Sequence, residues 1–304
     1  MNLIIVNLSG GLGNQMFQYA AGKALALRTG GQLRLFIESF AGYKLHNGFE
    51  LHRIFDCPDP LATRADIRDV LGWRTELAYG QLLPRKPFRF FRGNRFIMEP
   101  SFRYWPGYTE LTDNCFLFGY WQSPKYFSDL CGPLRRYFRF KQPLSEDNAV
   151  WIDKINNVDS VSVHIRRNDY VKNPATLAKH GICTEAYYRS SIDFVAERVA
   201  EPVFFIFSDD VRWARENIRF DFPHEFVCNN AGTASYNDMR LMSSCKHHII
   251  ANSSFSWWGA WLSHPADEKI VISPQPWFDD TLIDASDLVP QNWLRLPKNP
   301  TRSA

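Results

Sequence analysis

Two polar clusters in the second half of the chain are suited to holding a phosphorylated ligand. The first is His164-Ile165-Arg166-Arg167-Asn168-Asp169, where Arg166 can donate paired hydrogen bonds to phosphate oxygens. The second is Ser253-Ser254-Phe255-Ser256, whose hydroxyls precede a helix-forming run that can aim free N–H groups at an anion. Together they predict a site for a ligand with several phosphate oxygens.

A pair of carboxylates, Asp209-Asp210, follows another apolar run. Carboxylates repel phosphate, so they fit a donor-rich edge better, such as the N1–H and N2 amino group of guanine. Each of these features also has a structural alternative. Adjacent arginines often form solvated ion pairs, and Asp210 or Ser254 can simply cap a helix.

The N-terminal loop Ser9-Gly10-Gly11-Leu12-Gly13 suggests dinucleotide binding, because it follows an apolar run and Glu38 ends the next one. The match is partial, since Met16 occupies the third glycine position. A tight strand-to-helix turn that requires glycine is the structural alternative. An NAD-dependent oxidoreductase built on this loop is therefore the main alternative function.

No metal site is predicted from the sequence. His247 and His248 are adjacent in a predicted strand, so their side chains point to opposite faces. The H-E-x-x-H, G-x-S-x-G and G-x-x-x-x-G-K-[ST] patterns do not occur, nor does Asp-x-Asp, the usual metal bridge to a nucleotide diphosphate.

The elements that must position these residues alternate between short strands and helices. In the first half, residues 3–6 and 32–37 are predicted strands that flank a helix over 14–29, which ends at Gly30-Gly31. In the second half, strands are predicted over 160–165, 203–207, 225–228, 248–251 and 270–272, with helices over 185–199, 211–218, 236–245 and 255–262. This alternation predicts α/β domains with parallel sheets, in which ligands bind at the carboxyl ends of the strands.

Length and composition set the organisation. The 304 residues suggest two domains, and we expect them to span 1–150 and 151–304, joined by a polar connection near 142–157. The chain is 45% hydrophobic and nearly balanced in charge, with 35 Lys+Arg against 32 Asp+Glu, which argues against disorder and against a dedicated nucleic-acid binder. The six cysteines form no C-x-x-C, and from the sequence we expect neither a signal peptide nor a membrane span. We therefore expect a cytoplasmic protein with reduced thiols.

Two basic, aromatic stretches occur at residues 85–95 and 135–139. We expect them to be surface segments whose rings turn inward, with contact at the inner face of the membrane as the alternative.

Four blocks together resemble a known family, the bacterial α-1,2-fucosyltransferases of glycosyltransferase family 11. They are Asn7 to Ala20 (NLSGGLGNQMFQYA), His164 to Tyr170 (HIRRNDY), Phe207 to Asp210 (FSDD) and Asn252 to Ala260 (NSSFSWWGA), in family order. The resemblance implies a GT-B fold with two Rossmann-like domains facing a cleft. It also implies transfer of L-fucose from GDP-β-L-fucose to the 2-hydroxyl of a galactoside, with inversion and without a metal or other cofactor.

The resemblance further implies roles for single residues. Arg166 would hold the diphosphate, Asn14 would lie near the fucose, and Asp169 would be a catalytic carboxylate. Donor-binding residues would be His164, Asp209, Asp210, Ser253, Ser254 and Ser256, with Gly11 and Gly13 of the glycine loop. Of the two aspartates, Asp210 is favoured for guanine or ribose. The acceptor would be a galactose-terminated oligosaccharide or a lipid-linked glycan, bound mainly by the N-terminal domain.

The general base is left open. Asp169 is the nearest carboxylate of the motif, but it can instead hold Arg166 or Arg167 in place, and a phosphate oxygen of the donor can accept the proton. A non-catalytic sugar- or nucleotide-binding protein of the same fold is a further alternative.

Overall fold

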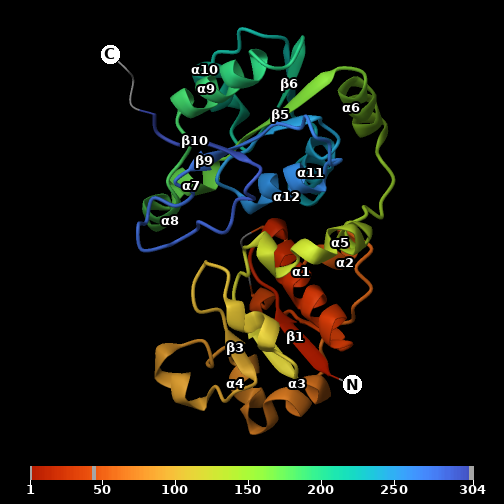
Figure 1. The fold of residues 1–304 in the computed structure, drawn as a ribbon, viewed down its shortest axis with the longest axis vertical. Coiled ribbons are helices and arrows are strands. Elements are labelled where there is room, and N and C mark those ends of the chain that lie inside the picture. Colours follow the sequence, from red (N-terminus) through yellow and green to blue (C-terminus); the bar gives the residue numbers. More distant parts are fainter. Residues whose placement is uncertain (1, 43–45, 301–304) are drawn as a thin grey trace. The chain divides into compact units, whose positions relative to one another are not determined.

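The computed structural model describes residues 2–42 and 46–300, without the side chains of Asn168 and Asp169, and its backbone forms two compact units (Figure 1). Unit 1 comprises Met1–Lys141 with Ser286–Leu288, and unit 2 comprises Gln142–Ala285 with Val289–Ala304. The first boundary falls at 141/142, whereas the sequence suggested 150/151.

Unit 1 is built on a four-stranded sheet with the order β2-β1-β4-β3, in which every strand pair is parallel. Its strands are β1 (Leu3–Asn7), β2 (Gln32–Phe36), β3 (Phe96–Met98) and β4 (Cys115–Phe118). The predicted first two strands are confirmed. The strand β3 and the strand β4 lie in a region where the sequence pattern gave no clear elements.

The helix α1 (Leu12–Thr29) connects β1 to β2 and confirms the predicted helix. It ends where Gly30 adopts a left-handed conformation with φ of 63°, which favours glycine. Gly22 lets the helix approach the sheet closely, because a Cβ there would lie 2.9 Å from Leu33 Cδ1 and 3.1 Å from Val6 Cβ. Gly30 therefore ends α1, and Gly22 allows it to pack closely on the sheet.

The rest of unit 1 consists of short helices around this sheet. The α-helices are α2 (Leu51–Ile54), α3 (Arg64–Leu71), α4 (Thr75–Tyr79) and α5 (Cys131–Tyr137). The 3₁₀ turns are η1 (Glu38–Phe40), η2 (Gly72–Arg74), η3 (Lys86–Phe91), η4 (Pro106–Glu110), η5 (Pro124–Tyr126) and η6 (Ser128–Leu130). The core between α3 and the sheet includes Ile5, Ile67, Val70, Phe96 and Phe116.

Unit 2 is built on a six-stranded parallel sheet with the order β10-β9-β8-β5-β6-β7. Its strands are β5 (Asp159–Ile165), β6 (Pro202–Ser208), β7 (His224–Val227), β8 (His247–Ile249), β9 (Val271–Gln275) and β10 (Leu294–Pro297). The first five overlap the five predicted strands. Numbered within this unit, the order is 3-2-1-4-5-6 of the nucleotide-binding α/β fold, whose strand order reverses between β5 and β8.

The helices of unit 2 include the four predicted ones, three of which end one to three residues earlier than predicted. They are α6 (Glu146–Asn156), α7 (Asn168–Lys172), α8 (Pro174–His180), α9 (Glu185–Ala196), α10 (Val211–Asn217), α11 (Tyr236–Met242) and α12 (Ser254–Leu262), with a 3₁₀ turn η7 (Gly232–Ala234). The chain passes between the units at the start of the polar stretch 142–157, but most of that stretch is the helix α6. Ser145 accepts a hydrogen bond from the Asn148 N–H and caps α6, which buries Ile155 and packs on β5 and α11.

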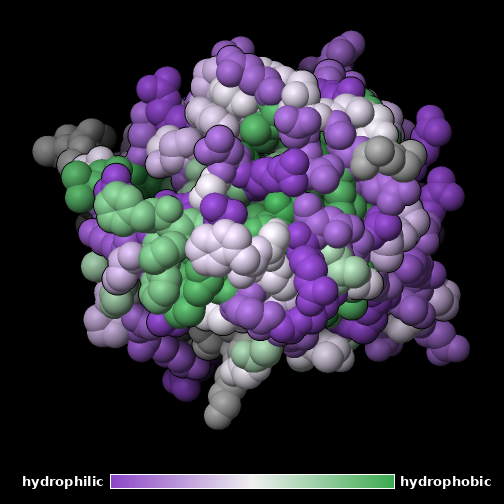
Figure 2. Space-filling view, turned by 90° about the horizontal axis from the view of Figure 1, so that it is seen from below, coloured by the Kyte–Doolittle hydropathy of each residue, from purple (hydrophilic) through white to green (hydrophobic). Residues whose placement is uncertain are grey.

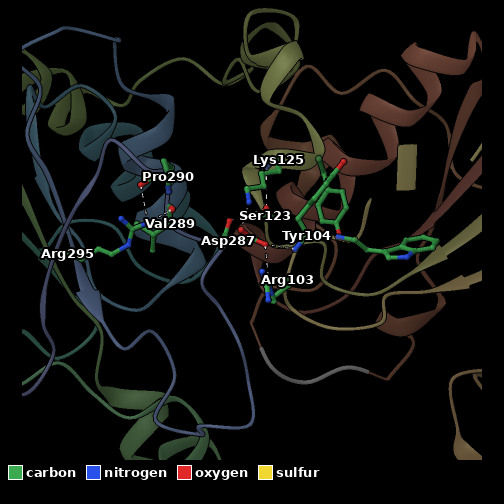
Figure 3. Close-up of polar contacts among 10 residues, drawn as sticks. Arg103, Tyr104, Ser123, Lys125, Asp287, Val289, Pro290 and Arg295 are labelled. Atoms are coloured by element: carbon green, nitrogen blue, oxygen red, sulfur yellow. Dashed lines mark hydrogen bonds and ion pairs between the residues drawn. The ribbon is translucent and has the colours of Figure 1, made fainter. Parts of the chain in front are cut away.

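A short segment late in the chain, Ser286–Leu288, packs within unit 1 although its neighbours on both sides belong to unit 2. The Asp287 carboxylate accepts a hydrogen bond from the Tyr104 N–H (3.1 Å) and pairs with Lys125, while Ser123 Oγ donates to the Asp287 carbonyl (3.0 Å; Figure 3). Leu288 is fully buried. Polar contacts from Tyr104, before β4, and from Ser123 and Lys125, after it, therefore hold Asp287, which lies 162 residues after Lys125 in the sequence.

In the described residues, no helix is long and apolar enough to cross a membrane. The six cysteines, all within the described ranges, are free thiols. The expectation that the aromatic rings of the basic stretches turn inward holds for Phe138, which is buried. It was wrong for Phe90, whose side chain is 86% exposed.

Candidate functional site

The carboxyl ends of β5, β6 and β8 bring the predicted phosphate-binding residues together. Strand order reverses between β5 and β8, which is where parallel α/β sheets bind their ligands. The Tyr170 hydroxyl, in α7 after β5, donates to the Asn252 carbonyl after β8 at 3.1 Å. The His164 ring lies 5.8 Å from that of Phe255. The clusters that are 80 to 90 residues apart in sequence thus form one edge, as the strand-end rule predicted.

Arg166 is held in place by a carboxylate at this edge. Asp209 Oδ2 lies 3.3 Å from Arg166 Nε, and Asp209 Oδ1 accepts from the backbone N–H of Arg167 at 2.9 Å. The two side chains remain 24% and 21% exposed. A partly exposed guanidinium that is positioned beforehand is suited to binding an anion.

Its neighbour Arg167 has a different environment. The Arg167 guanidinium lies over the Trp213 ring at 4.4 Å, a cation–π contact on α10. The two adjacent arginines are therefore not interchangeable, because Arg166 pairs with the Asp209 carboxylate whereas Arg167 packs on an aromatic ring.

His164 is buried and uncharged at neutral pH. Burial, with a smaller contribution from the nearby positive charge of Arg166, lowers the pKa of His164 to about 3. Its Nδ1 atom has no hydrogen-bond partner among the described residues. A buried ring nitrogen without a partner is uncommon and is suited to a hydrogen bond with a ligand.

The serines after β8 play different parts. Ser253 caps α12, because its hydroxyl accepts from the Phe255 N–H at 3.3 Å. Ser256 is fully buried and its hydroxyl contacts the backbone carbonyls of Ala251 and Ser253 at 3.4 and 3.3 Å. Ser254 is the first residue of α12, a position from which a helix N-terminus favours anions. The three serines therefore lie together at the N-terminus of α12.

The two aspartates after β6 also differ. Asp210 Oδ1 accepts from the Trp213 N–H at 3.1 Å and so caps α10, which is the structural alternative considered for it. Asp209 anchors the arginines. Both carboxylates are partly exposed. Asp169 lies in α7 three residues after Arg166, but its side chain is outside the described part of the protein.

The remaining predicted residues lie at the carboxyl edge of the unit 1 sheet, at the N-cap and in the first turn of α1. Gly11 caps α1, Gly13 is buried in its first turn, and a Cβ at Gly10 would lie 2.6 Å from Asn14 Nδ2. Asn14 Oδ1 accepts from Gln122 Nε2 at 2.7 Å. Asn14 is therefore fixed by a residue that follows β4, at the reversal of strand order in this sheet.

Two glutamines of α1 hold this edge together, and the sequence analysis did not assign them. Gln18 bonds to the Ser9 N–H and hydroxyl and to the Gly119 carbonyl, at 2.9 to 3.0 Å. Gln15 donates to the carbonyls of Gly10 and Gly48 and accepts from the Glu50 N–H, at 2.8 to 3.0 Å. Both are fully buried. The amide side chains at these two positions, within an otherwise largely apolar helix, were the available signal.

Glu99 was missed as well, because β3 was not predicted. It follows β3 directly, and its carboxylate accepts from the backbone N–H groups of Tyr120 (2.7 Å) and Trp121 (3.0 Å). Burial raises the pKa of Glu99 to about 7, against the opposing effect of these two hydrogen bonds. A carboxylate of this kind at a sheet edge is a proton-binding group near neutral pH.

Among the described residues, no group of three or more His, Cys, Asp or Glu side chains is arranged to hold a metal ion. The adjacent histidines His247 and His248 do not converge on one metal site, because each contacts different protein groups. His248 contacts the hydroxyls of Ser162 and Ser263, both at 2.8 Å, while His247 Nδ1 accepts from the Ile270 N–H.

Comparisons with known proteins agree with the four sequence blocks. The family model described as "Glycosyl transferase family 11" matches residues 95–296. An α-1,2-colitosyltransferase of Escherichia coli is 36% identical over 303 residues, which cover 98% of this chain and 100% of that protein. The O-antigen biosynthesis glycosyltransferase WbnK of Escherichia coli is 34% identical over 309 residues, covering 95% of this chain and 99% of the relative.

Two more distant likenesses bear on the fold and the family. The bovine galactoside 2-α-L-fucosyltransferase SEC1 is 27% identical over 265 residues, 85% of this chain and 64% of its own length. The crystal structure of the α-1,6-fucosyltransferase NodZ soaked with GDP-fucose matches with a TM-score of 0.50 at 15% identity, covering 86% of this chain and 92% of that one. The predicted GT-B type of α/β fold is confirmed. The family match over two thirds of the chain shows that the chain belongs to glycosyltransferase family 11.

Proposed function

We propose that this enzyme transfers L-fucose from GDP-β-L-fucose to the 2-hydroxyl of a terminal galactoside, with inversion and without a metal ion. The observation that carries the proposal is the pre-positioned Arg166, which Asp209 holds at the strand-order reversal of unit 2 beside the neutral His164. Family membership and the α-1,2 linkage named for its relatives support the same reaction class.

Unit 2 binds the donor in this proposal. The Arg166 guanidinium donates to diphosphate oxygens, and Ser254 and the N-terminus of α12 bind the same anion. His164 offers its Nδ1, which has no hydrogen-bond partner among the described residues, to guanine or ribose. Asp210, which remains partly exposed while it caps α10, presents carboxylate oxygen to the donor-rich edge of guanine.

The reaction breaks the bond between fucose C1 and the β-phosphate oxygen, and its electron pair stays on the leaving GDP. The acceptor O2 bonds to C1 from the opposite face, which inverts the configuration. As C1 becomes oxocarbenium-like, negative charge grows on the diphosphate. A guanidinium already held at that position stabilises the charge without reorganisation, an effect worth about 3 to 4 kcal/mol for one positioned donor.

The hydroxyl proton has two candidate acceptors in this scheme, the Asp169 carboxylate and an oxygen of the departing diphosphate. The alternative role for Asp169, holding the arginines, is one that Asp209 already fills for Arg166. Asp169→Asn separates the cases: normal GDP binding with no transfer supports the base, while lost GDP binding supports a structural role.

Unit 1 binds the galactoside in this proposal, at the edge where Asn14, Gln122 and Glu99 follow or adjoin strand ends. These side chains offer both donors and acceptors, as sugar hydroxyls require. The acceptor is a galactose-terminated oligosaccharide or lipid-linked glycan.

A second donor has a specific observation in its favour. The Escherichia coli relative with 36% identity is named as an α-1,2-colitosyltransferase, so colitose is the alternative sugar. Assays with GDP-fucose and with GDP-linked colitose, side by side at equal concentrations, decide between them by their kcat/KM values.

The first test is a thermal shift with GDP in the presence of EDTA, beside UDP and NADH. A ligand at a hundred times its Kd adds about 2.7 kcal/mol of stability. We expect GDP alone to raise the melting temperature, by a few degrees. Stabilisation by NADH alone would instead mark the glycine loop of residues 9–13 as the active site and contradict the proposal.

A further inference from the structure

One surface of unit 1 combines exposed aromatic rings with many positive charges. Trp73 is 64% exposed, Phe90 is 86% exposed and Phe91 is 45% exposed, and all three lie in or beside η2 and η3. We call the surface formed by residues 68–95 the aromatic-basic surface. Figure 2, seen from the side on which α3 and α4 lie in Figure 1, shows hydrophobic side chains gathered beside strongly hydrophilic ones.

The rings and the cations of this surface are in contact with one another. The Trp73 and Phe91 rings meet edge to face with centroids 6.0 Å apart. The Arg74 guanidinium lies 4.7 Å from the Trp73 ring centre, and that of Arg89 lies 5.3 Å from the Phe90 ring centre. The apolar and charged groups therefore form a single mixed surface.

A hollow of about 470 Å³ lies within the same surface and is lined by four arginines. Arg74 Nε donates to the Phe91 carbonyl (2.6 Å), Arg92 donates to the carbonyls of Leu83 and Pro84 (2.9 and 3.0 Å), and Arg95 donates to that of Asp69 (3.3 Å). Arg68 completes the set. These carbonyl bonds position the guanidinium groups without neutralising their charge.

The surface has a strong net positive charge. Residues 68–95 contain the basic residues Arg68, Arg74, Arg85, Lys86, Arg89, Arg92 and Arg95. Against them stand Asp69 and Glu76, and Glu76 forms an ion pair with Arg64 of α3. The whole chain has a formal charge of only +3, so positive charge is concentrated here.

We propose that the aromatic-basic surface binds the surface of an anionic lipid bilayer. Aromatic rings partition into the interface between headgroups and acyl chains, and arginines pair with lipid phosphates. A ring that protrudes as far as that of Phe90 fits insertion into a soft interface. The arginine-lined hollow takes a phosphate headgroup. Contact with the membrane through unit 1 goes beyond the transfer reaction and does not depend on it.

The test is sedimentation of the purified chain with vesicles of phosphatidylcholine alone and of phosphatidylcholine mixed with phosphatidylglycerol. We expect binding to the mixed vesicles only. Raising the salt from about 0.1 M to about 1 M shortens the screening length from about 10 Å to about 3 Å and should release the protein. Each basic residue near an anionic surface contributes about fivefold to the binding constant, the equivalent of about 1 kcal/mol.

Two variants test the aromatic and the basic parts separately. Phe90→Ser, and the double variant Lys86→Ser with Arg89→Ser, should each weaken binding to mixed vesicles by about tenfold or more. Leu282→Ser and Arg212→Ser are matched controls in unit 2, because these side chains are 91% and 87% exposed. All four variants should keep the melting temperature of the wild type and its transfer rate to a small water-soluble acceptor. A failure of the membrane proposal can therefore be distinguished from a failure of the proposed reaction.

Two results would overturn the proposal. One is the absence of binding to mixed vesicles at about 0.1 M salt. The other is unchanged vesicle binding in both test variants. Binding to a labelled single-stranded oligonucleotide is measured in parallel. Binding to the oligonucleotide without binding to vesicles would assign the surface to nucleic acid instead.

Discussion

Asp209 positions Arg166: one carboxylate oxygen lies 3.3 Å from Arg166 Nε, and the other accepts from the N–H of Arg167 at 2.9 Å. The two residues come from the ends of adjacent strands, β5 and β6, and lie 43 residues apart in the sequence. The contact fixes a guanidinium at the edge where this fold binds nucleotides. It links the fold of unit 2 directly to the proposed stabilisation of the leaving diphosphate.

Arg166→Ala should lower kcat by at least about a hundredfold, because it removes a positioned donor that stabilises developing charge. Steady-state transfer from GDP-fucose to a galactoside measures the effect. Arg212→Ala is the matched control, since that side chain is 87% exposed on α10 and should leave the rate unchanged. Near-normal turnover of the Arg166 variant would remove this residue from the mechanism.

A double-mutant cycle tests whether Asp209 acts through Arg166. Asp209→Ala alone should lower kcat, but by less than Arg166→Ala, because the guanidinium remains and loses only its anchor. The double variant should be no slower than Arg166→Ala, so that the two effects are strongly non-additive. Additive losses would show that Asp209 contributes separately, for example by contacting the donor itself.

Asp238 should make the stability of unit 2 depend on pH. Burial raises the pKa of Asp238 to about 7, while its Oδ1 accepts from Asn230 Nδ2 at 2.9 Å. The folded state then holds a proton that the unfolded chain, with a pKa near 3.8, releases earlier. The stabilising effect is therefore present at low pH and lost as the pH rises from about 4 through about 7, at about 1.4 kcal/mol per pKa unit.

Asp238→Asn keeps the hydrogen-bonding oxygen and removes the titration. Its melting temperature should rise relative to the wild type between about pH 5 and pH 8. Asp267→Asn, at an exposed position, is the control. If the melting temperatures of the wild type and the Asp238 variant change with pH in the same way over that range, this carboxyl does not bind its proton as described.

Gly119 should tolerate no side chain, because a Cβ there would lie 2.3 Å from Glu99 Cβ. Gly119→Ala must displace Glu99 from the N–H groups of Tyr120 and Trp121, so we expect a loss of about 1 to 3 kcal/mol in the free energy of unfolding. Gly132→Ala is a matched control, since a Cβ in that turn of α5 meets nothing within 4 Å. Chemical denaturation measures both, and equal stabilities would contradict the packing described for this edge.

The parts of the fold with simple local signals were predictable from the sequence. The glycine stop at Gly30, the apolar strand runs and the helix predicted from residue 185 mark elements that the structure confirms. The rule that ligand-binding residues follow parallel strands placed Arg166, Asp209 and Ser254 at one edge. These are short-range patterns whose meaning does not depend on distant residues.

Other features depend on contacts that no local pattern encodes. The strands β3 and β4 are only three and four residues long and are surrounded by aromatic loops, so Glu99 was not recognised as a strand-end residue. The helix α6 is polar on most of its surface and buries only Asn148 and Ile155, which made it resemble a linker. The placement of Asp287 within unit 1 follows from long-range contacts with Tyr104 and Lys125 (Figure 3).

The measurement that tests the central claim most directly is transfer from GDP-β-L-fucose to a galactoside in the presence of EDTA, with the linkage of the product assigned by NMR. The account predicts a fucosyl α-1,2-galactoside from the wild type and a loss of at least about a hundredfold with Arg166→Ala. GDP binding without any product from GDP-fucose or GDP-linked colitose, or product formed equally well without Arg166, would contradict it.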